Sequence, residues 1–119
     1  MLTLSPDEKK RYELAQSIET MAGTDAWGRL LVAMTNLEAE SVAKLEAYLD
    51  TEAHPDREEV MTMVLQWHAR RAYRKMLLQN VEDAKDYRRE LKMNILEQYA
   101  QNPQQPVAGD VVEMITEGI

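Results

Sequence analysis

The two histidines come first, because the chain has no cysteine and therefore no thiolate to bind a metal or attack a substrate. A di-metal site in a helical bundle is built from inward glutamates and Glu-x-x-His pairs. The residue three positions before His54 is Thr51. The residue three positions before His68 is Leu65, so neither histidine has the paired glutamate. We therefore expect no metal site, with His54 in a turn and His68 on a helix surface or at an interface.

Groups that could carry acid–base or nucleophilic catalysis are the next candidates. None of the serines or threonines lies in a strand–turn–helix elbow or beside a recognisable His/Asp arrangement. The four glycines, at positions 23, 28, 109 and 118, are too scattered to form a phosphate-binding loop. We therefore expect no catalytic residues, no cofactor and a protein that is not an enzyme.

Basic residues are concentrated in one stretch, and a basic helix face could bind the phosphates of a nucleic acid. Residues 57–92 carry nine bases against six acids, whereas residues 25–56 carry seven acids against two bases. The whole chain has a net charge of −7. We favour pairing between an acidic helix and a basic one, and keep nucleic-acid binding as the alternative. The residues of that possible surface are Arg70, Arg71, Arg74, Lys75, Lys85, Arg88, Arg89 and Lys92.

Local signals divide the first half of the chain into two helices. Ser5-Pro6-Asp7-Glu8 is typical of a helix start, because its serine can cap the helix and its glutamate follows three residues later. Gly23 is expected to end or kink this helix. A second amphipathic helix runs to about Asp50. Pro55 disfavours a helical conformation at the residue before it, so the chain is expected to turn there.

The longest uninterrupted stretch follows the turn. From Asp56 to Gln101 the sequence has no glycine or proline, which predicts a helical arm of about 45 residues. Within it, Asn80 could cap a new helix, with Asp83 three residues later, so a second break is expected there. Because a short turn makes neighbouring helices antiparallel, the two arms are expected to lie side by side.

The predicted fold class is all-α, in one of two versions. The first is a long antiparallel helical hairpin with arms 6–50 and 56–101 and breaks near Gly23 and Asn80. The second folds the same helices into a four-helix bundle, and either version carries an extended C-terminal tail. A two-helix hairpin buries only one stripe of each helix, so the first version needs another subunit to cover its remaining apolar surface.

The segment after the turn is apolar on more than one side. One face is expected to pack on the second helix, and another is expected to pack on a second subunit. Further along, apolar residues step by three or four, a spacing close to the heptads of a coiled coil. The residues of the expected oligomer interface are Val60, Met61, Met63, Val64, Trp67, Tyr73, Met76 and Leu77.

The C-terminal tail is expected to be a separate segment. Residues 1–101 form the helical domain, residues 102–109 a Pro/Gln linker, and residues 110–119 an arm too short to fold alone. Exposure of its apolar side chains to water is unfavourable, so we interpret it as an arm that docks on another protein. A disordered end, or an arm folded back on its own helices, is the alternative. The expected docking residues are Val111, Val112, Met114, Ile115 and Ile119.

One family resemblance adds to this interpretation. Residues 27–79 combine a Trp-led amphipathic helix, a short acidic turn with proline, and a helix containing Gln-Trp-His-Ala-Arg-Arg-Ala-Tyr-Arg at 66–74. This pattern resembles the small helical-hairpin proteins encoded in the virion and packaging modules of tailed bacteriophages. The resemblance implies a non-enzymatic role in the particle, in head assembly, next to the portal or tail, or as a packaging accessory.

The sequence therefore predicts a non-enzymatic structural or assembly protein. We expect it to form a homo-oligomer and to bind another structural protein through its C-terminal arm. The alternative is a small nucleic-acid-binding packaging subunit, similar to a small terminase, or a regulatory subunit. We expect residues 1–7 not to act as a signal peptide, and no apolar run approaches the ~20 residues of a membrane span. We expect a location in the cytoplasm of the producing cell or in a virion, and no membrane partner.

Overall fold

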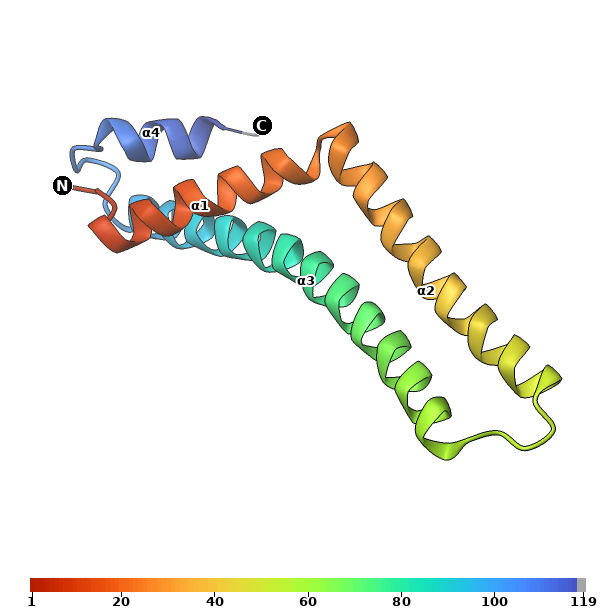
Figure 1. Cartoon of the computed structure of the whole chain (residues 1–119). Helices are drawn as coiled ribbons and strands as arrows, with labels where there is room; N and C mark the ends of the chain where they lie inside the picture. The colour runs from red at the N-terminus through yellow and green to blue at the C-terminus, as the bar shows by residue number, and fades with distance from the viewer. Residues whose placement is uncertain (118–119) are drawn as a thin grey trace. The chain divides into compact units, whose positions relative to one another are not determined.

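The computed structural model describes residues 1–117, and within them the chain forms four α-helices and no strand. The predicted all-α class is confirmed. The chain divides into two compact units. The core unit combines Met1–Met21 with Val81–Ile119, and the hairpin unit is Ala22–Asn80. The helices, labelled in Figure 1, are α1 (Pro6–Ala22), α2 (Asp25–Thr51), α3 (Arg57–Gln101) and α4 (Gly109–Thr116).

The predicted start of α1 is confirmed in atomic detail. The backbone N–H of Glu8 donates to the Ser5 hydroxyl over 3.1 Å, and the backbone N–H of Ser5 donates to the Glu8 carboxylate over 2.9 Å. This reciprocal pair satisfies two donors that the first turn of a helix leaves without an intrahelical partner. Helix α1 ends at Ala22, next to the predicted break at Gly23, and the Thr24 hydroxyl then caps α2.

The expected break at Asn80 is absent, because α3 is continuous from Arg57 to Gln101. Capping by Asn80 would require an extended backbone there, and the neighbouring side chains favour the helix instead. Leu77, Val81 and Ala84 follow one another at four and three residues, and all three are at least half-buried. A continuous helix keeps them on one packed face.

This packed face of α3 has an unusually regular spacing. Its buried and half-buried residues alternate steps of three and four from Val60 to Ile95, which is the heptad-like periodicity of paired helices. Three of the positions hold arginine rather than an apolar residue, and each arginine meets a partner described below. The residues of this face are Val60, Met63, Trp67, Arg70, Arg74, Leu77, Val81, Ala84, Arg88, Leu91 and Ile95.

The core unit joins both ends of the described chain. Leu2 pairs with the segment before α4, since its backbone N–H donates to the Pro106 carbonyl over 2.8 Å and its carbonyl accepts from Ala108 over 3.0 Å. Side chains from the N-terminal segment, α1, α3 and α4 meet in one apolar cluster. The buried residues of this cluster are Leu2, Leu4, Tyr12, Leu91, Ile95, Val111 and Met114.

The expectation of a free C-terminal arm needs correction. Val111 and Met114 are 0% and 1% exposed, so they are core residues of their own chain rather than an open docking surface. The physical reason is that the eight-residue α4 cannot leave its apolar face in water, and α1 and α3 offer a matching surface. Ile115 is half-buried against the same cluster, Val112 is exposed, and Ile119 lies outside the described residues.

The hairpin unit pairs α2 with the first half of α3 in antiparallel fashion (Figure 1). Contacts between Arg70 and Ser41 and between Arg74 and Glu38 fix the register of this pair. In the connecting loop, the backbone N–H of Asp56 donates to the Tyr48 hydroxyl over 2.9 Å. Within residues 1–117, no helix combines the length and apolarity needed to cross a bilayer.

Candidate functional site

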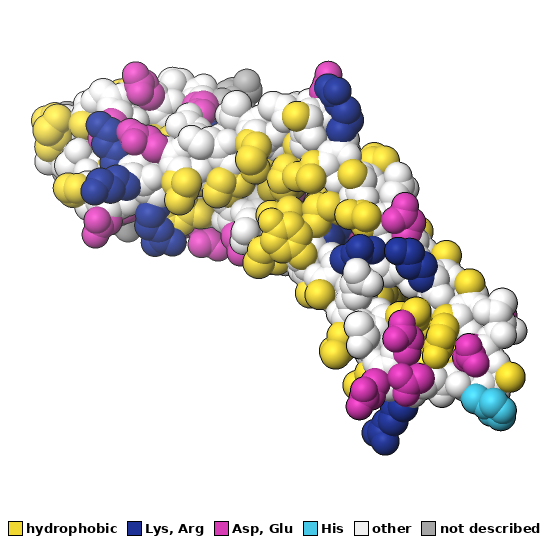
Figure 2. Space-filling model, in the orientation of Figure 1, with side chains coloured by type: hydrophobic (Ala, Val, Ile, Leu, Met, Phe, Trp, Pro, Cys, Tyr) yellow, Lys and Arg dark blue, Asp and Glu magenta, His cyan; other side chains and the backbone are white. Residues whose placement is uncertain are grey.

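The two units differ in the number of apolar residues that they bury. Ten apolar residues of the described core unit are buried, whereas Met34 is the one apolar residue that the hairpin unit buries. In the hairpin unit, large apolar side chains reach the surface on both helices (Figure 2). The described core unit also exposes seven large apolar side chains, so the hairpin unit is set apart by its lack of buried apolar residues rather than by the number it exposes. We take the exposed apolar side chains of the hairpin unit as the candidate functional site. They are Leu30, Val32, Leu37, Leu49, Met61, Leu65, Tyr73, Met76 and Leu78.

Part of this surface is hollowed into a groove between α2 and α3, with a volume of about 360 Å³. Two exposed leucines contribute to it. Leu37 follows Leu30 by seven positions, so the two lie two turns apart on one face of α2. We call this the hairpin groove. Its lining residues are Leu30, Met34, Leu37, Ala69, Arg70 and Tyr73.

The floor of the hairpin groove is held by a polar layer between the helices. One Arg70 guanidinium nitrogen donates to the Ser41 hydroxyl over 2.6 Å and to the Leu37 carbonyl over 3.0 Å. Ser41 is 4% exposed, so its hydroxyl is removed from water and gains its partners inside the protein. This layer fixes which residues of α2 face which residues of α3, as a polar core position does in a coiled coil.

A second polar layer lies one turn along the hairpin. Arg74 donates from two nitrogens to both carboxylate oxygens of Glu38, one of these bonds being 3.3 Å long. The hydrogen bonds from Arg74 lower the pKa of Glu38, and the nearby charges of Arg71 and Lys75 act in the same direction. The same pairing raises the pKa of Arg74. The acidic helix and the basic helix therefore attract each other within the chain.

The Glu38–Arg74 pair predicts an acid-sensitive hairpin. Because the pKa of Glu38 is lower in the folded chain than its ordinary value of 4.5, the pair's contribution is fully present above about pH 4.5 and is lost as the pH falls further. We expect Glu38→Gln to lower the melting temperature at pH 7, and the difference from the natural chain to shrink as the pH is lowered below 4.5. Thermal melts followed by circular dichroism test this expectation. Glu40→Gln, on the same helix, is the control, and equal loss in both variants would contradict it.

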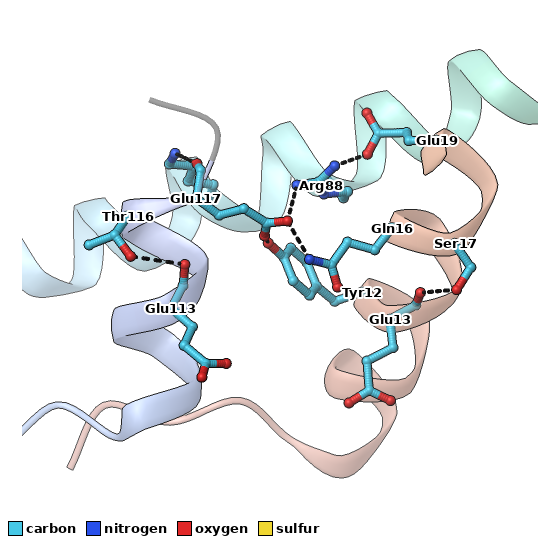
Figure 3. A network of polar contacts seen from close by, with 10 residues as sticks. Tyr12, Glu13, Gln16, Ser17, Glu19, Arg88, Glu113, Thr116 and Glu117 are labelled. Atoms are coloured by element: carbon cyan, nitrogen blue, oxygen red, sulfur yellow. Dashed lines mark hydrogen bonds and ion pairs between the residues drawn. The ribbon is translucent and has the colours of Figure 1, made fainter. Parts of the chain in front are cut away.

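The core unit contains a separate polar network around Arg88 (Figure 3). Its guanidinium bonds to Glu19 on one side and lies 3.1 Å from a Glu117 carboxylate oxygen on the other. The ring of Tyr12 lies 5.3 Å from its central carbon. Tyr12 and Gln16 also donate hydrogen bonds to Glu117, so the residue after α4 is tied to both α1 and α3.

This network changes the acidity of its members. Burial raises the pKa of Tyr12, and the hydrogen bond to Glu117 raises it further. Burial alone would raise the pKa of Glu117, but hydrogen bonds from Tyr12, Gln16 and Arg88 lower it overall. Burial alone would lower the pKa of Arg88, but bonds to Glu19 and Tyr12 raise it overall. The charged forms of Glu117 and Arg88 are therefore both stabilised. This is expected of an ion pair that holds helices together rather than of a proton-transfer site.

The residues expected at an oligomer interface separate into two groups. Val60, Met63, Trp67 and Leu77 are half-buried on the packed face of α3, and Val64 is half-buried beside them. These positions are partly used inside the chain. Met61, Tyr73 and Met76 are about half exposed, and Tyr73 lines the hairpin groove.

The basic residues are largely engaged with groups of their own chain. Arg70, Arg74 and Arg88 bond to residues on neighbouring helices, as described above. The Lys92 ammonium donates to the Glu117 carbonyl over 3.0 Å. Arg71 and Lys75 lie close enough to Glu38 to lower its pKa. On the surface of α3, Lys85 pairs with Glu82 at 3.6 Å and Arg89 pairs with Asp86 at 3.4 Å.

Sequence reasoning missed the α2 side of the groove. Leu30 and Leu37 belong to the amphipathic helix expected before the turn, yet both remain more than 40% exposed. The available signal was the stripe Trp27, Leu31, Met34, which alternates steps of four and three and already fills the inner face. Because that stripe already occupies the face of α2 that packs on α3, Leu30 and Leu37 must lie beside it, at the edge of the packed face.

The histidines take the positions expected from the sequence. His54 lies in the loop between α2 and α3, and His68 is an exposed helix residue whose ring lies 4.9 Å from that of Trp67. In the part of the chain that the structure describes, no three acidic or histidine side chains gather as metal ligands would.

Comparison with known proteins adds no relative. No protein-family model matches the chain, and neither a curated protein nor a solved structure does.

Proposed function

We propose that this chain is a helical assembly protein whose hairpin unit binds other protein chains, first of all copies of itself. One observation carries the proposal. The described core unit buries ten apolar residues and exposes seven large ones, whereas the hairpin unit buries only Met34 and exposes nine large ones, so the hairpin unit has almost no apolar core of its own. Burial of apolar surface is the dominant favourable term in protein association, and exposed apolar patches of this kind mark interaction sites.

The order of the hairpin unit supports the same conclusion. Polar layers at Arg70 and Arg74 fix the register of its two helices, so the apolar residues that line the hairpin groove are held in a defined arrangement. Such a preorganised surface binds a partner at a lower entropic cost than a segment that must fold on contact. In this proposal the chain has a structural role and catalyses no reaction.

The resemblance to phage virion and packaging proteins suggests where such a protein would act. A chain of this kind would act inside the producing cell or within a particle, where many copies meet at high local concentration. Weak apolar contacts between copies then suffice, because each added contact acts within an assembly already formed. Nucleic-acid binding receives no separate proposal, since the basic side chains largely meet acids and carbonyls of their own chain.

The mass of the chain in solution tests the proposal. We expect light scattering coupled to size-exclusion chromatography to give a multiple of 13.7 kDa that shifts with concentration in the micromolar range. Sedimentation velocity at several concentrations provides an independent check. A constant mass of 13.7 kDa up to the highest soluble concentration would contradict self-association.

A further inference from the structure

The hairpin groove is short, apolar and open, and these properties restrict what fits it. Its lining is apolar except for Arg70, whose guanidinium already bonds to Ser41 and to the Leu37 carbonyl. Small-molecule sites usually add several convergent polar groups to an apolar wall, and the groove lacks such a set. A groove between two helices instead accepts the side-chain ridge of another helix.

We propose that this groove receives the hairpin of a second copy, with α3 of one copy lying against α2 of the other. The result is a four-helix bundle made of two hairpin units. This inference rests on the proposed function and names the surface through which it acts. Two independent observations carry it, the charges of the two helices and the area of the apolar patch.

The charges of the helices in the hairpin unit are equal and opposite. Helix α2 (Asp25–Thr51) carries five acids against two bases, a net charge of −3. The first part of α3, residues 57–80, carries five bases against two acids, a net charge of +3. A twofold axis parallel to the helices places each acidic helix beside the basic helix of the other copy. The opposite pairing, α2 against α2, would bring like charges together.

The apolar area is of the size that an interface centre needs. Four side chains at and beside the groove are each about half exposed. Taking ~200 Å² for a full large side chain, they leave roughly 400 Å² of apolar surface. This matches the apolar centre of an interface that covers ~800 Å² per partner, the size of a standard specific contact. The four side chains are Leu30, Leu37, Tyr73 and Met76.

The register of the hairpin predicts which residues meet. Arg74 pairs with Glu38 inside one copy and the two helices are antiparallel, so Tyr73 and Leu37 lie at nearly the same level, about 3 Å apart along the helix axis. Rotation about an axis parallel to the helices preserves this level. Tyr73 of one copy is therefore expected to contact Leu37 of the other, and the contact occurs twice in the dimer.

Cross-linking tests this contact directly, because the natural chain has no cysteine. We expect an equimolar mixture of the full-length Leu37→Cys and Tyr73→Cys variants, treated with a short bifunctional maleimide, to give a covalent dimer of twice 13.7 kDa. Each variant alone should give much less. A mixture of Ala43→Cys and Ala72→Cys, two exposed positions outside the groove lining, is the matched control. Equal cross-linking in both mixtures, or of Leu37→Cys with itself, would overturn the proposed pairing.

A charge placed in the groove gives the second test. We expect Leu37→Glu to raise the concentration at which half of the chains are dimeric by at least about tenfold, while Ala43→Glu, at an exposed position of α2 outside the groove lining, leaves it unchanged. Circular dichroism checks that both variants keep their helices. If the natural chain self-associates and Leu37→Glu does so equally well, the groove belongs to another protein or an apolar ligand, and this inference fails while the proposed function stands. If the natural chain remains monomeric, both fail.

Discussion

Replacing Met114 with alanine is expected to lower the free energy of unfolding by about 3 kcal/mol. The side chain is 1% exposed and lies in the apolar cluster with Leu91 and Ile95. Truncation removes buried methylene and thioether groups and leaves a cavity that the surrounding helices fill only partly. For a unit of this size, such a loss lowers the melting temperature by more than 10 °C.

Two adjacent valines provide the matched control for Met114. Val111 and Val112 share helix α4 but are 0% and 47% exposed. Val111→Ala should therefore destabilise the chain by about 1–2 kcal/mol, and Val112→Ala should stay within about 0.5 kcal/mol of the natural protein. Urea denaturation followed by circular dichroism measures all three variants. If Met114→Ala and Val111→Ala melt like the natural chain, α4 does not belong to the core and acts as a docking arm after all.

Replacing Arg88 with alanine should lower the free energy of unfolding by about 2 kcal/mol. The change leaves the carboxylates of Glu19 and Glu117 without their common cation in a partly buried site. Removing one partner of a buried ion pair costs about 3–5 kcal/mol. The smaller value applies here because the paired side chains keep 22–33% of their exposure, so that water screens the remaining charge.

A triple replacement separates the cost of unpaired charges from the value of the ion pairs. Arg88→Met combined with Glu19→Gln and Glu117→Gln removes all three charges and keeps most of the side-chain volume, so it should lose much less stability than Arg88→Ala. Arg89→Ala, at a neighbouring exposed position, should change the free energy of unfolding by less than about 0.5 kcal/mol. Chemical denaturation of the four proteins completes the comparison. Equal losses for Arg88→Ala and Arg89→Ala would show that the network around Arg88 contributes nothing.

Local sequence signals predicted the helix ends that depend on local chemistry. The Ser5–Glu8 capping pair, the break after Ala22 and the loop before α3 all follow from residues within a few positions of each boundary. The expected break at Asn80 failed because a local cap competed with packing on other helices. Val81 and Ala84, both buried, extend the packed face of α3 through that point. Periodicity over the whole helix outweighed one capping pattern.

The surfaces against which the helices pack were harder to predict than the helices themselves. The apolar pattern of residues 110–119 showed that the tail needs a partner surface, but it did not show that the surface belongs to the same chain. That outcome depends on Leu2 and Leu4, which precede the first helix and pair with or pack beside the C-terminal segment. Likewise, the arginine positions of α3 looked like a basic surface, because the sequence does not display that Ser41, Glu38 and Glu19 lie opposite them.

The discontinuous make-up of the core unit has a consequence for the order of folding during synthesis. The hairpin unit is one continuous segment, so its two helices can pair as soon as α3 leaves the ribosome. The core unit needs residues 1–21 together with α4, whose contacts span more than 100 positions, such as Tyr12 with Glu117. Closing so long a loop is slow, as for any fold of high contact order. We therefore expect the hairpin unit of the nascent chain to form before residues 1–21 and α4 have met.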